Sequence, residues 1–340
     1  MSHFILSVII PCYNNVELLS EMIECCICQS FSEWELIIVD DQSTDNRSAI
    51  IENYIKDDRI KFFIRDREPK GSVVCRNIGF EKSTGKYVMH LDADDLISST
   101  CFENRVKFME DNPDADYASF PAKAFYDPDH LPTFNSNAKT WGVGSDHDDL
   151  LKMFLEVNYP FSVWNNIYKR SAIESIMWDE KVKIYTDFSF IVPCILHNLK
   201  HKFSHLQEID YFYRMSYTSN NMCVSFVTRE KCESTIYLFD KTLKSLQLLP
   251  DYNIRKRQYQ KFYLLQCERL ILNKETDYLS DFLLFGKQYF SGSFMQKINI
   301  ANKIISKKFS YKVRFSILYL TFALLFRYPR YMNVFINKLR

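Results

Sequence analysis

The chain has 340 residues, of which 47% are hydrophobic and 16% aromatic, with only 7 glycines. This composition excludes a disordered or collagen-like protein and gives room for one large α/β domain with a smaller helical part. The formal net charge of +1 hides an asymmetry, because residues 282–340 hold eleven of the 43 Lys and Arg and none of the 42 Asp and Glu. We therefore expect an acidic or neutral body and a basic C-terminal region that seeks an anionic partner.

The first 95 residues alternate strand-like and helical segments. Continuous apolar, β-branched runs predict buried strands, and apolar side chains at helical spacing predict the helices between them. The predicted strands are 4–11, 35–39, 60–64 and 87–91, and the predicted helices are 14–31, 45–56 and 72–83. This order predicts a Rossmann-like α/β fold, a mostly parallel sheet flanked by helices on both faces.

The later segments are less regular. Residues 121–145 are dominated by Pro, Asn, Asp and Gly without a sustained period, which predicts a long loop. A helix is expected over 148–157, another opening near Asp187, and a final strand leading into 211–214. From Thr228 onward the pattern predicts helices with short joints. We therefore divide the chain into an α/β domain, 1–225, and a C-terminal helical extension, 226–340.

Ligands of such sheets bind outside the carboxyl ends of the strands. The acidic run Asp92-Ala93-Asp94-Asp95 follows the fourth predicted strand, and alternate carboxylates there can turn toward one point. Hard oxygen ligands of this kind suit Mn2+ or Mg2+, with phosphate oxygens completing the shell. The alternative is a solvated acidic turn in which Asp95 caps the next helix.

The end of the second strand offers a second candidate position. Asp41 could accept the imide N–H of a uracil ring, and Tyr13, after the first strand, could stack on the base. The alternative is a helix N-cap, a role for which Ser43 and Asp45 compete.

Three segments resemble, in order and spacing, the family 2 glycosyltransferases of the GT-A fold: VIIPCYNN (8–15), VDDQSTDN (39–46) and GSVVCRNIGFEKSTGKYVMHLDADD (71–95). Three later segments look like the acceptor-side blocks of bacterial members: WNNIYKRSAI (164–173), YTDFSF (185–190) and YFYRMSYTSNNMCVS (211–225). Thr186 departs from the family pattern, since an acid is common there.

The resemblance implies a role for each matching residue. In the donor site it implies Pro11, Tyr13 and Asp41 around the nucleoside, with Asp40, Arg76, Asn77 and Arg214 nearby. It implies Asp92 and Asp94 as metal ligands, Asp92 also facing the donor, and Asp187 as the general base.

The resemblance also implies the reaction. A single base opposite the leaving group gives one displacement, hence inversion at the anomeric carbon. The expected donor is a UDP-hexose, with glucose or galactose as the sugar. The expected acceptor is a saccharide, polyprenyl-diphosphate-linked, in O-antigen or capsule assembly. A non-catalytic, membrane-associated sugar-nucleotide-binding protein is the alternative. A nucleotidyltransferase or dehydrogenase is disfavoured, because residues 11–16 lack the glycines of a phosphate loop.

The basic tail suggests a location. The apolar run Phe315–Phe326 is 12 residues, too short to span a bilayer, but its helical spacing and basic flanks fit an anionic membrane surface. The alternative is an ordinary helix that packs on the domain, and no nucleic-acid-binding motif accompanies the charge.

The N-terminus lacks signal-peptide features and the cysteines lack paired spacing. We expect a peripheral protein on the cytoplasmic face of the bacterial inner membrane.

Overall fold

The computed structural model describes residues 4–45, 47–137, 139–215 and 228–305, together with residues 317, 321, 322, 325 and 326. The chain divides into two compact units. The first comprises Met1–Phe154 and Asn158–Asn221, and the second comprises Leu155–Val157 and Met222–Arg340. The sequence predictions for 216–227 and for most of the basic tail lie outside the described residues.

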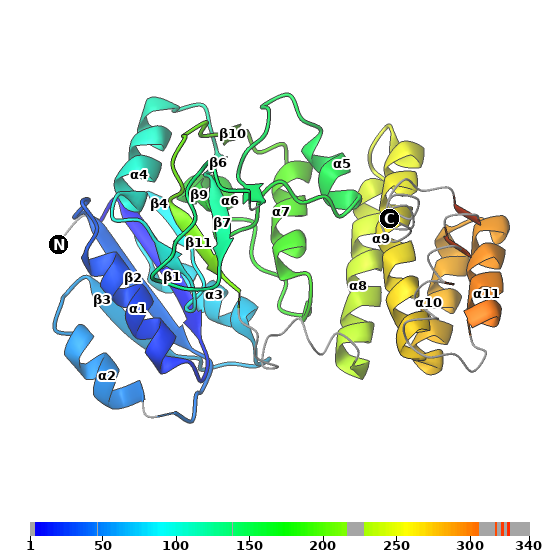
Figure 1. Ribbon diagram of the computed structural model, residues 1–340, viewed down its shortest axis with the longest axis horizontal. Helices are drawn as coiled ribbons and strands as arrows, with labels where there is room; N and C mark the ends of the chain where they lie inside the picture. Colours follow the sequence, from blue (N-terminus) through cyan, green and yellow to red (C-terminus); the bar gives the residue numbers. More distant parts are fainter. Residues whose placement is uncertain are drawn as a thin grey trace. The chain divides into compact units, whose positions relative to one another are not determined.

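A seven-stranded sheet forms the centre of the first unit (Figure 1). Its strand order is β10-β6-β9-β4-β1-β2-β3, and β9 is antiparallel to both of its neighbours while the other adjacent pairs are parallel. The mostly parallel sheet predicted from the sequence is therefore confirmed. The strands are β1 Leu6–Cys12, β2 Trp34–Asp40, β3 Ile60–Ile64, β4 Tyr87–His90, β6 Tyr117–Ser119, β9 Asn166–Lys169 and β10 His201–Phe203.

Helices cover both faces of this sheet, since β1 and β2 are buried along their whole length. Alternate side chains of these strands, such as Val8 and Leu36, share a core cluster with the buried faces of α1 and α4. The opposite face packs against α3, so closely that a Cβ on Gly79 would lie 2.4 Å from Ile9 Cγ2. The helices are α1 Val16–Ile27, α2 Arg47–Tyr54, α3 Ser72–Lys82 and α4 Cys101–Asp111.

A second, four-stranded sheet has the order β5-β11-β7-β8. It consists of β5 Leu96–Ile97, β7 Ala122–Phe125, β8 Thr140–Trp141 and β11 Tyr211–Arg214. The prediction of a continuous loop over 121–145 is wrong at its ends, because β7 and β8 pair across the loop. Strands of four and two residues carry no readable period, and the second partner of β7, β11, lies far along the chain.

The segment between β7 and β8 is anchored by a buried lysine. The ammonium of Lys123, fully buried on β7, donates to the carbonyl oxygens of Phe134 and Ser136 at 2.7 and 2.6 Å. It also donates to the Ser136 hydroxyl at 3.0 Å. All three ammonium donors are thus used, as a buried cation requires.

The remaining helices complete both units. Those that begin in the first unit are α5 Leu150–Leu155, α6 Arg170–Ile173 and α7 Thr186–Leu196. The second unit contains α8 Arg229–Leu246, α9 Tyr252–Asn273, α10 Thr276–Tyr289 and α11 Gly292–Ile305, as expected for a helical C-terminal part. Within the described residues, no helix has the length and apolar character needed to cross a membrane.

Two aromatic side chains of the basic tail lie inside the second unit. Phe322 is fully buried, and the ring of Phe326 meets that of Phe294 on α11 edge to face at 5.5 Å. These two residues belong to the apolar stripe predicted for 315–326, so this part of the stripe packs on protein.

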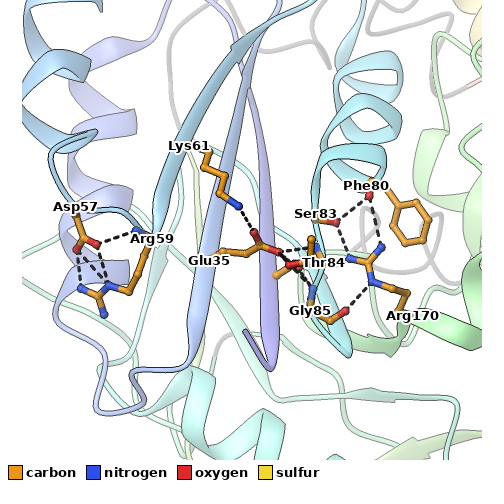
Figure 2. Close-up of polar contacts among 10 residues, drawn as sticks. Glu35, Asp57, Arg59, Lys61, Phe80, Ser83, Thr84, Gly85 and Arg170 are labelled. Atoms are coloured by element: carbon orange, nitrogen blue, oxygen red, sulfur yellow. Dashed lines mark hydrogen bonds and ion pairs between the residues drawn. The ribbon is translucent and has the colours of Figure 1, made fainter. Parts of the chain in front are cut away.

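The amino-terminal ends of the strands are joined by a buried polar network around Glu35 (Figure 2). Its carboxylate accepts hydrogen bonds from the Ser7 hydroxyl at 2.7 Å, the Thr84 N–H at 2.5 Å and the Thr84 hydroxyl at 2.9 Å. The Gly85 N–H at 3.3 Å and the Lys61 ammonium at 2.7 Å complete the set. Burial alone would raise the pKa of Glu35, but the bonds from Lys61, Ser7 and Thr84 outweigh it and lower that pKa.

Arg170 extends this network to α6. Its guanidinium donates to the Gly85 carbonyl oxygen and to the Ser83 hydroxyl, each at 2.6 Å (Figure 2). The amino-terminal ends of β1, β2, β3 and β4 are therefore held together by charge-assisted hydrogen bonds, which leaves the opposite ends of the strands for chemistry.

Candidate active site

The polar strand ends selected from the sequence lie side by side at the carboxyl edge of the sheet. Strands β4, β1 and β2 are consecutive neighbours, and Cys12 at the end of β1 pairs with Asp40 at the end of β2. The sheet therefore places Tyr13, Asp41 and the run beginning at Asp92 along one edge, as in other open parallel sheets.

The β2 end has two carboxylates with different surroundings. Asp40 is fully buried and accepts from the backbone N–H of Ser43 at 3.0 Å and from its hydroxyl, so it closes the turn after β2. Asp41 accepts from Arg65 Nε at 2.5 Å and from the Gly71 N–H at 3.3 Å. Asp41 is therefore held as a directed carboxylate beside a cation.

Tyr13 and Pro11 flank this position from β1. Pro11 is buried within β1, whereas Tyr13 is 45% exposed and carries the Lys70 ammonium 3.6 Å from its ring centroid. The exposed ring could stack on a base, and the ammonium beside it could bind a phosphate.

Helix α3 contributes Arg76 and Asn77, both buried. Arg76 donates to Asp92 and lies 4.8 Å from the ring centroid of Trp178. The Asn77 amide bonds the Trp178 backbone in both directions, at 3.0 Å each, and also donates to Glu180 at 2.8 Å. Arg76 thus faces the acidic run, whereas the described contacts of Asn77 fasten the segment that precedes α7.

The carboxylates of the acidic run after β4 have raised pKa values. Burial raises the pKa of Asp92 to about 6, with Arg76 opposing this and the charges of Asp94 and Asp187 adding to it. Burial also raises the pKa of Asp94, against the lowering effects of Arg214 and Arg76. Carboxylates whose ionised forms are disfavoured in this way are stabilised by an added cation.

Asp95 has a different role from its two neighbours. It is fully buried and accepts from the Tyr211 hydroxyl at 2.5 Å and from the Arg214 N–H at 2.7 Å. Asp95 therefore joins the acidic run to β11 of the second sheet. The Arg214 side chain reaches back to the Asp94 carbonyl oxygen at 2.6 Å and to Glu21 on α1.

Asp187 lies in the first turn of α7, where the helix dipole favours a carboxylate. Tyr185, which directly precedes the helix, has the left-handed backbone conformation, with φ of 62°. One carboxylate oxygen of Asp187 accepts from the Ser162 hydroxyl. Because the charge of Asp187 raises the pKa of Asp92, the structure brings the predicted base and a predicted metal ligand into one electrostatic cluster.

The final residue of β4, His90, is a buried, neutral side chain two positions before Asp92. It is 1% exposed, and neither ring nitrogen has a hydrogen-bond partner among the described residues. Its ring meets those of Trp178 and Phe190 at 5.3 and 5.7 Å. Burial lowers the pKa of His90 well below its usual value, so the imidazole is neutral near pH 7.

The acidic run suits a metal that also binds substrate. Within the described residues, no group of three or more His, Cys, Asp or Glu side chains could hold a metal ion. Mg2+ and Mn2+, however, commonly take only one or two carboxylates and complete their shell with phosphate oxygens and water. Asp92 and Asp94 fit that requirement.

Three residues that contact the predicted site residues were not selected from the sequence: Arg65, Ser162 and Trp178. Arg65 directly follows the predicted third strand, so the rule that selected Asp41 could also have selected Arg65. Ser162 and Trp178 lie in irregular segments that carry no periodic signal.

Comparison with known proteins accords with this geometry. A family model described as glycosyl transferase family 2 matches residues 7–176, half of the chain. The chain therefore belongs to glycosyl transferase family 2. The matched range begins within β1, contains β2 to β4, the acidic run and Ser162, and ends before Asp187.

Several curated proteins are similar to this chain. An uncharacterized glycosyltransferase of Haemophilus influenzae is 27% identical over 252 residues, covering 72% of this chain and 90% of that protein. A UDP-Glc:alpha-D-GlcNAc-diphosphoundecaprenol beta-1,3-glucosyltransferase of Escherichia coli is 28% identical over 192 residues, covering 52% and 74%. A Rickettsia felis glycosyltransferase is 41% identical over 106 residues, and the chain spans only 17% of its length.

Solved structures share the fold at low sequence identity. S. aureus TarS 1-349 in complex with UDP-GlcNAc has a TM-score of 0.62 and 16% identity, covering 93% of this chain and 90% of that one. The mannosyltransferase PcManGT of Pyrobaculum calidifontis, solved with GDP-Man and Mn2+, has a TM-score of 0.54 and 15% identity, covering 94% and 86%.

Proposed function

We propose that the protein transfers a hexose from a UDP-sugar to a saccharide acceptor with inversion at the anomeric carbon. The observation that carries this proposal is the pairing of two carboxylate sites. Asp187, on α7, is close enough to raise the pKa of Asp92, after β4. One site can hold the donor diphosphate through a divalent ion, and the other can take a proton from the acceptor.

The reaction follows from these roles. The acceptor hydroxyl gives its proton to Asp187 as its oxygen attacks the anomeric carbon of the donor. The bond between that carbon and the diphosphate oxygen breaks, and UDP leaves with the electron pair. Mn2+ or Mg2+ held by Asp92 and Asp94 would stabilise negative charge on the diphosphate. Arg76, already paired with Asp92, adds a fixed positive charge beside it.

The nucleoside side of the donor site is assigned to Tyr13, Asp41 and the edge of β1 around Pro11. Asp41 can accept the uracil imide N–H, while its ion pair with Arg65 directs the carboxylate. Asp40 supports this pocket by closing the turn after β2, and Asn77 supports it by fixing the segment before α7. Arg214 contributes from β11 through its contact with the Asp94 carbonyl oxygen.

We propose glucose or galactose as the sugar and a polyprenyl-diphosphate-linked saccharide as the acceptor, in surface polysaccharide assembly such as O-antigen or capsule. The similarity to a diphosphoundecaprenol glucosyltransferase supports this choice. In this proposal residues 1–225 form the catalytic domain.

The test combines binding and turnover. Thermal unfolding is measured with UDP-glucose, UDP-galactose, UDP-GlcNAc and GDP-mannose, each with and without Mn2+, because a bound donor stabilises the native state. UDP release is then measured for the wild type and for Asp187→Asn with the donor that gives the largest shift. We expect donor binding to persist and turnover to fall by about 100-fold or more. Unchanged turnover in Asp187→Asn would show that Asp187 is not the base. Donor binding without UDP release by the wild type would favour the alternative, a non-catalytic sugar-nucleotide-binding protein.

We further propose that residues 226–340 place the enzyme on an anionic membrane surface, at the cytoplasmic face of the inner membrane. Because Phe322 is buried, the proposed contact relies more on charge, including exposed Lys287, Lys297 and Lys303. Replacing these three lysines by Glu should weaken co-sedimentation with phosphatidylglycerol vesicles and leave that with phosphatidylcholine unchanged. Equal binding of the variant and the wild type to both vesicles would contradict the proposal.

A further inference from the structure

Ser162 lies beside the proposed base although the two residues are far apart in the chain. Its hydroxyl donates to Oδ2 of Asp187, from the irregular segment before β9 to the first turn of α7. No other hydrogen bond to this carboxylate is found in the part of the chain that the structure describes. The neighbouring Thr186 side chain likewise makes no hydrogen bond to Asp187 among those residues.

Ser162 is itself held in place by a buried side chain. Its backbone N–H donates to Asn165 Oδ1 at 2.8 Å, and Asn165 is fully buried. The Asn165 amide donates in turn to the Phe120 carbonyl oxygen at 2.7 Å, and the Phe120 N–H returns a bond to the Asn165 carbonyl oxygen at 2.9 Å. The hydroxyl is therefore presented to Asp187 from a turn fixed to the strand segment that follows β6.

This arrangement gives the two oxygens of the Asp187 carboxylate different surroundings. A hydroxyl donor on Oδ2 fixes the rotation of the carboxylate and leaves Oδ1 for the proton of an acceptor.

We propose that Ser162 is a positioning residue for the base: its hydroxyl holds one oxygen of the Asp187 carboxylate and so orients the other to take the acceptor proton. This inference rests on the proposed role of Asp187. The hydrogen bond that orients the base comes from a residue 25 positions earlier in the chain, outside α7. The neighbouring side chain at position 186 does not supply it.

The test uses the full chain and the UDP-sugar that the wild type turns over, from a panel of UDP-glucose, UDP-galactose and UDP-GlcNAc. Turnover is measured from pH 5 to pH 9 for the wild type, Ser162→Ala and Ser162→Thr. We expect kcat of Ser162→Ala to fall about tenfold, the size of one hydrogen bond to a charged group. Ser162→Thr, which keeps the hydroxyl, should restore kcat, and the KM for the donor should stay within twofold in both variants.

Ser189→Ala is the matched control. The Ser189 hydroxyl lies in the same helix but donates to the Thr186 backbone oxygen at 2.7 Å, not to the carboxylate. It should leave kcat unchanged. An equal loss of kcat in Ser162→Ala and Ser189→Ala, or a loss that Ser162→Thr does not restore, would mean that Ser162 only supports the fold and would overturn the inference. If Asp187→Asn retains full turnover, the proposed role of Asp187 fails. If Asp187→Asn loses turnover while kcat of Ser162→Ala is unchanged, only the inference about Ser162 fails.

Discussion

Replacement of Glu35 tests whether the amino-terminal network stabilises the sheet. In Glu35→Ala the buried Ser7 hydroxyl loses its acceptor, which costs about 1–3 kcal/mol. The two bonds from Thr84 are also lost, but Thr84 is exposed and can bind water, so each costs about 0.5–1.5 kcal/mol. Lys61, 36% exposed, also returns to water. We expect a net loss of about 3 kcal/mol in the free energy of unfolding, a large part of the stability of an ordinary domain.

The measurement is urea unfolding followed by tryptophan fluorescence. All four tryptophans, at positions 34, 141, 164 and 178, lie in the first unit, so the signal reports on the unit that contains Glu35. Glu35→Gln keeps one acceptor oxygen and should cost less than Glu35→Ala. Glu33→Ala, an exposed position two residues away, is the control and should change stability by less than about 0.5 kcal/mol.

The same variants make a pH prediction. The pKa of Glu35 is lowered from its usual value of 4.5, so its extra stabilisation is complete above pH 4.5 and is lost as the pH falls through the lowered pKa. The stability difference between wild type and Glu35→Gln should therefore narrow in acid. UDP-sugar binding should not change, because the network lies at the opposite ends of the strands from the acidic run. If Glu35→Ala and Glu33→Ala unfold at the same urea concentration, the network does not stabilise the sheet.

Three further variants probe other features. Asp94→Ala should abolish the Mn2+-dependent part of donor binding in titration calorimetry, and full Mn2+ dependence in the variant would show that Asp94 is not a ligand. The depressed pKa of His90 means that wild-type stability falls as the pH drops below about 6.5, by about 1.4 kcal/mol per pH unit for this residue. His90→Phe should reduce that slope in unfolding measurements from pH 6.5 to pH 5, and an unchanged slope would contradict the assignment. Asp210→Ala leaves the fully buried Arg105 without its bidentate partner, at 2.8 and 2.9 Å, and should cost about 3–5 kcal/mol in the free energy of unfolding. A loss below about 1 kcal/mol would show that water reaches Arg105.

The sequence was most informative where local pattern and fold agree. The strand over 60–64 was predicted with the bounds that β3 has, and α3 was predicted to within one residue. The polar residues after β1, β2 and β4 could be selected because parallel strands end at a common edge. These predictions need only periodicity and a general property of parallel sheets.

The second sheet could not be predicted in this way. β8 has two residues, and β11 pairs in parallel with β7 although nearly ninety positions separate them. Such pairing depends on long-range contacts that no local window contains. Ser162 is a similar case, since its contact with Asp187 depends on the placement of α7. The residues adjacent to Ser162 show no sequence pattern that indicates this contact.

The buried ammonium of Lys123 has a consequence for how this enzyme could diversify. It binds residues 134 and 136 mainly through backbone carbonyl oxygens, so it fixes the path of the loop while placing little demand on which side chains the loop carries. Residues 126–133 can therefore change in identity while the anchor on β7 is retained. We expect this stretch to be exchangeable between related enzymes as a cassette, with the sheet beneath it unaltered.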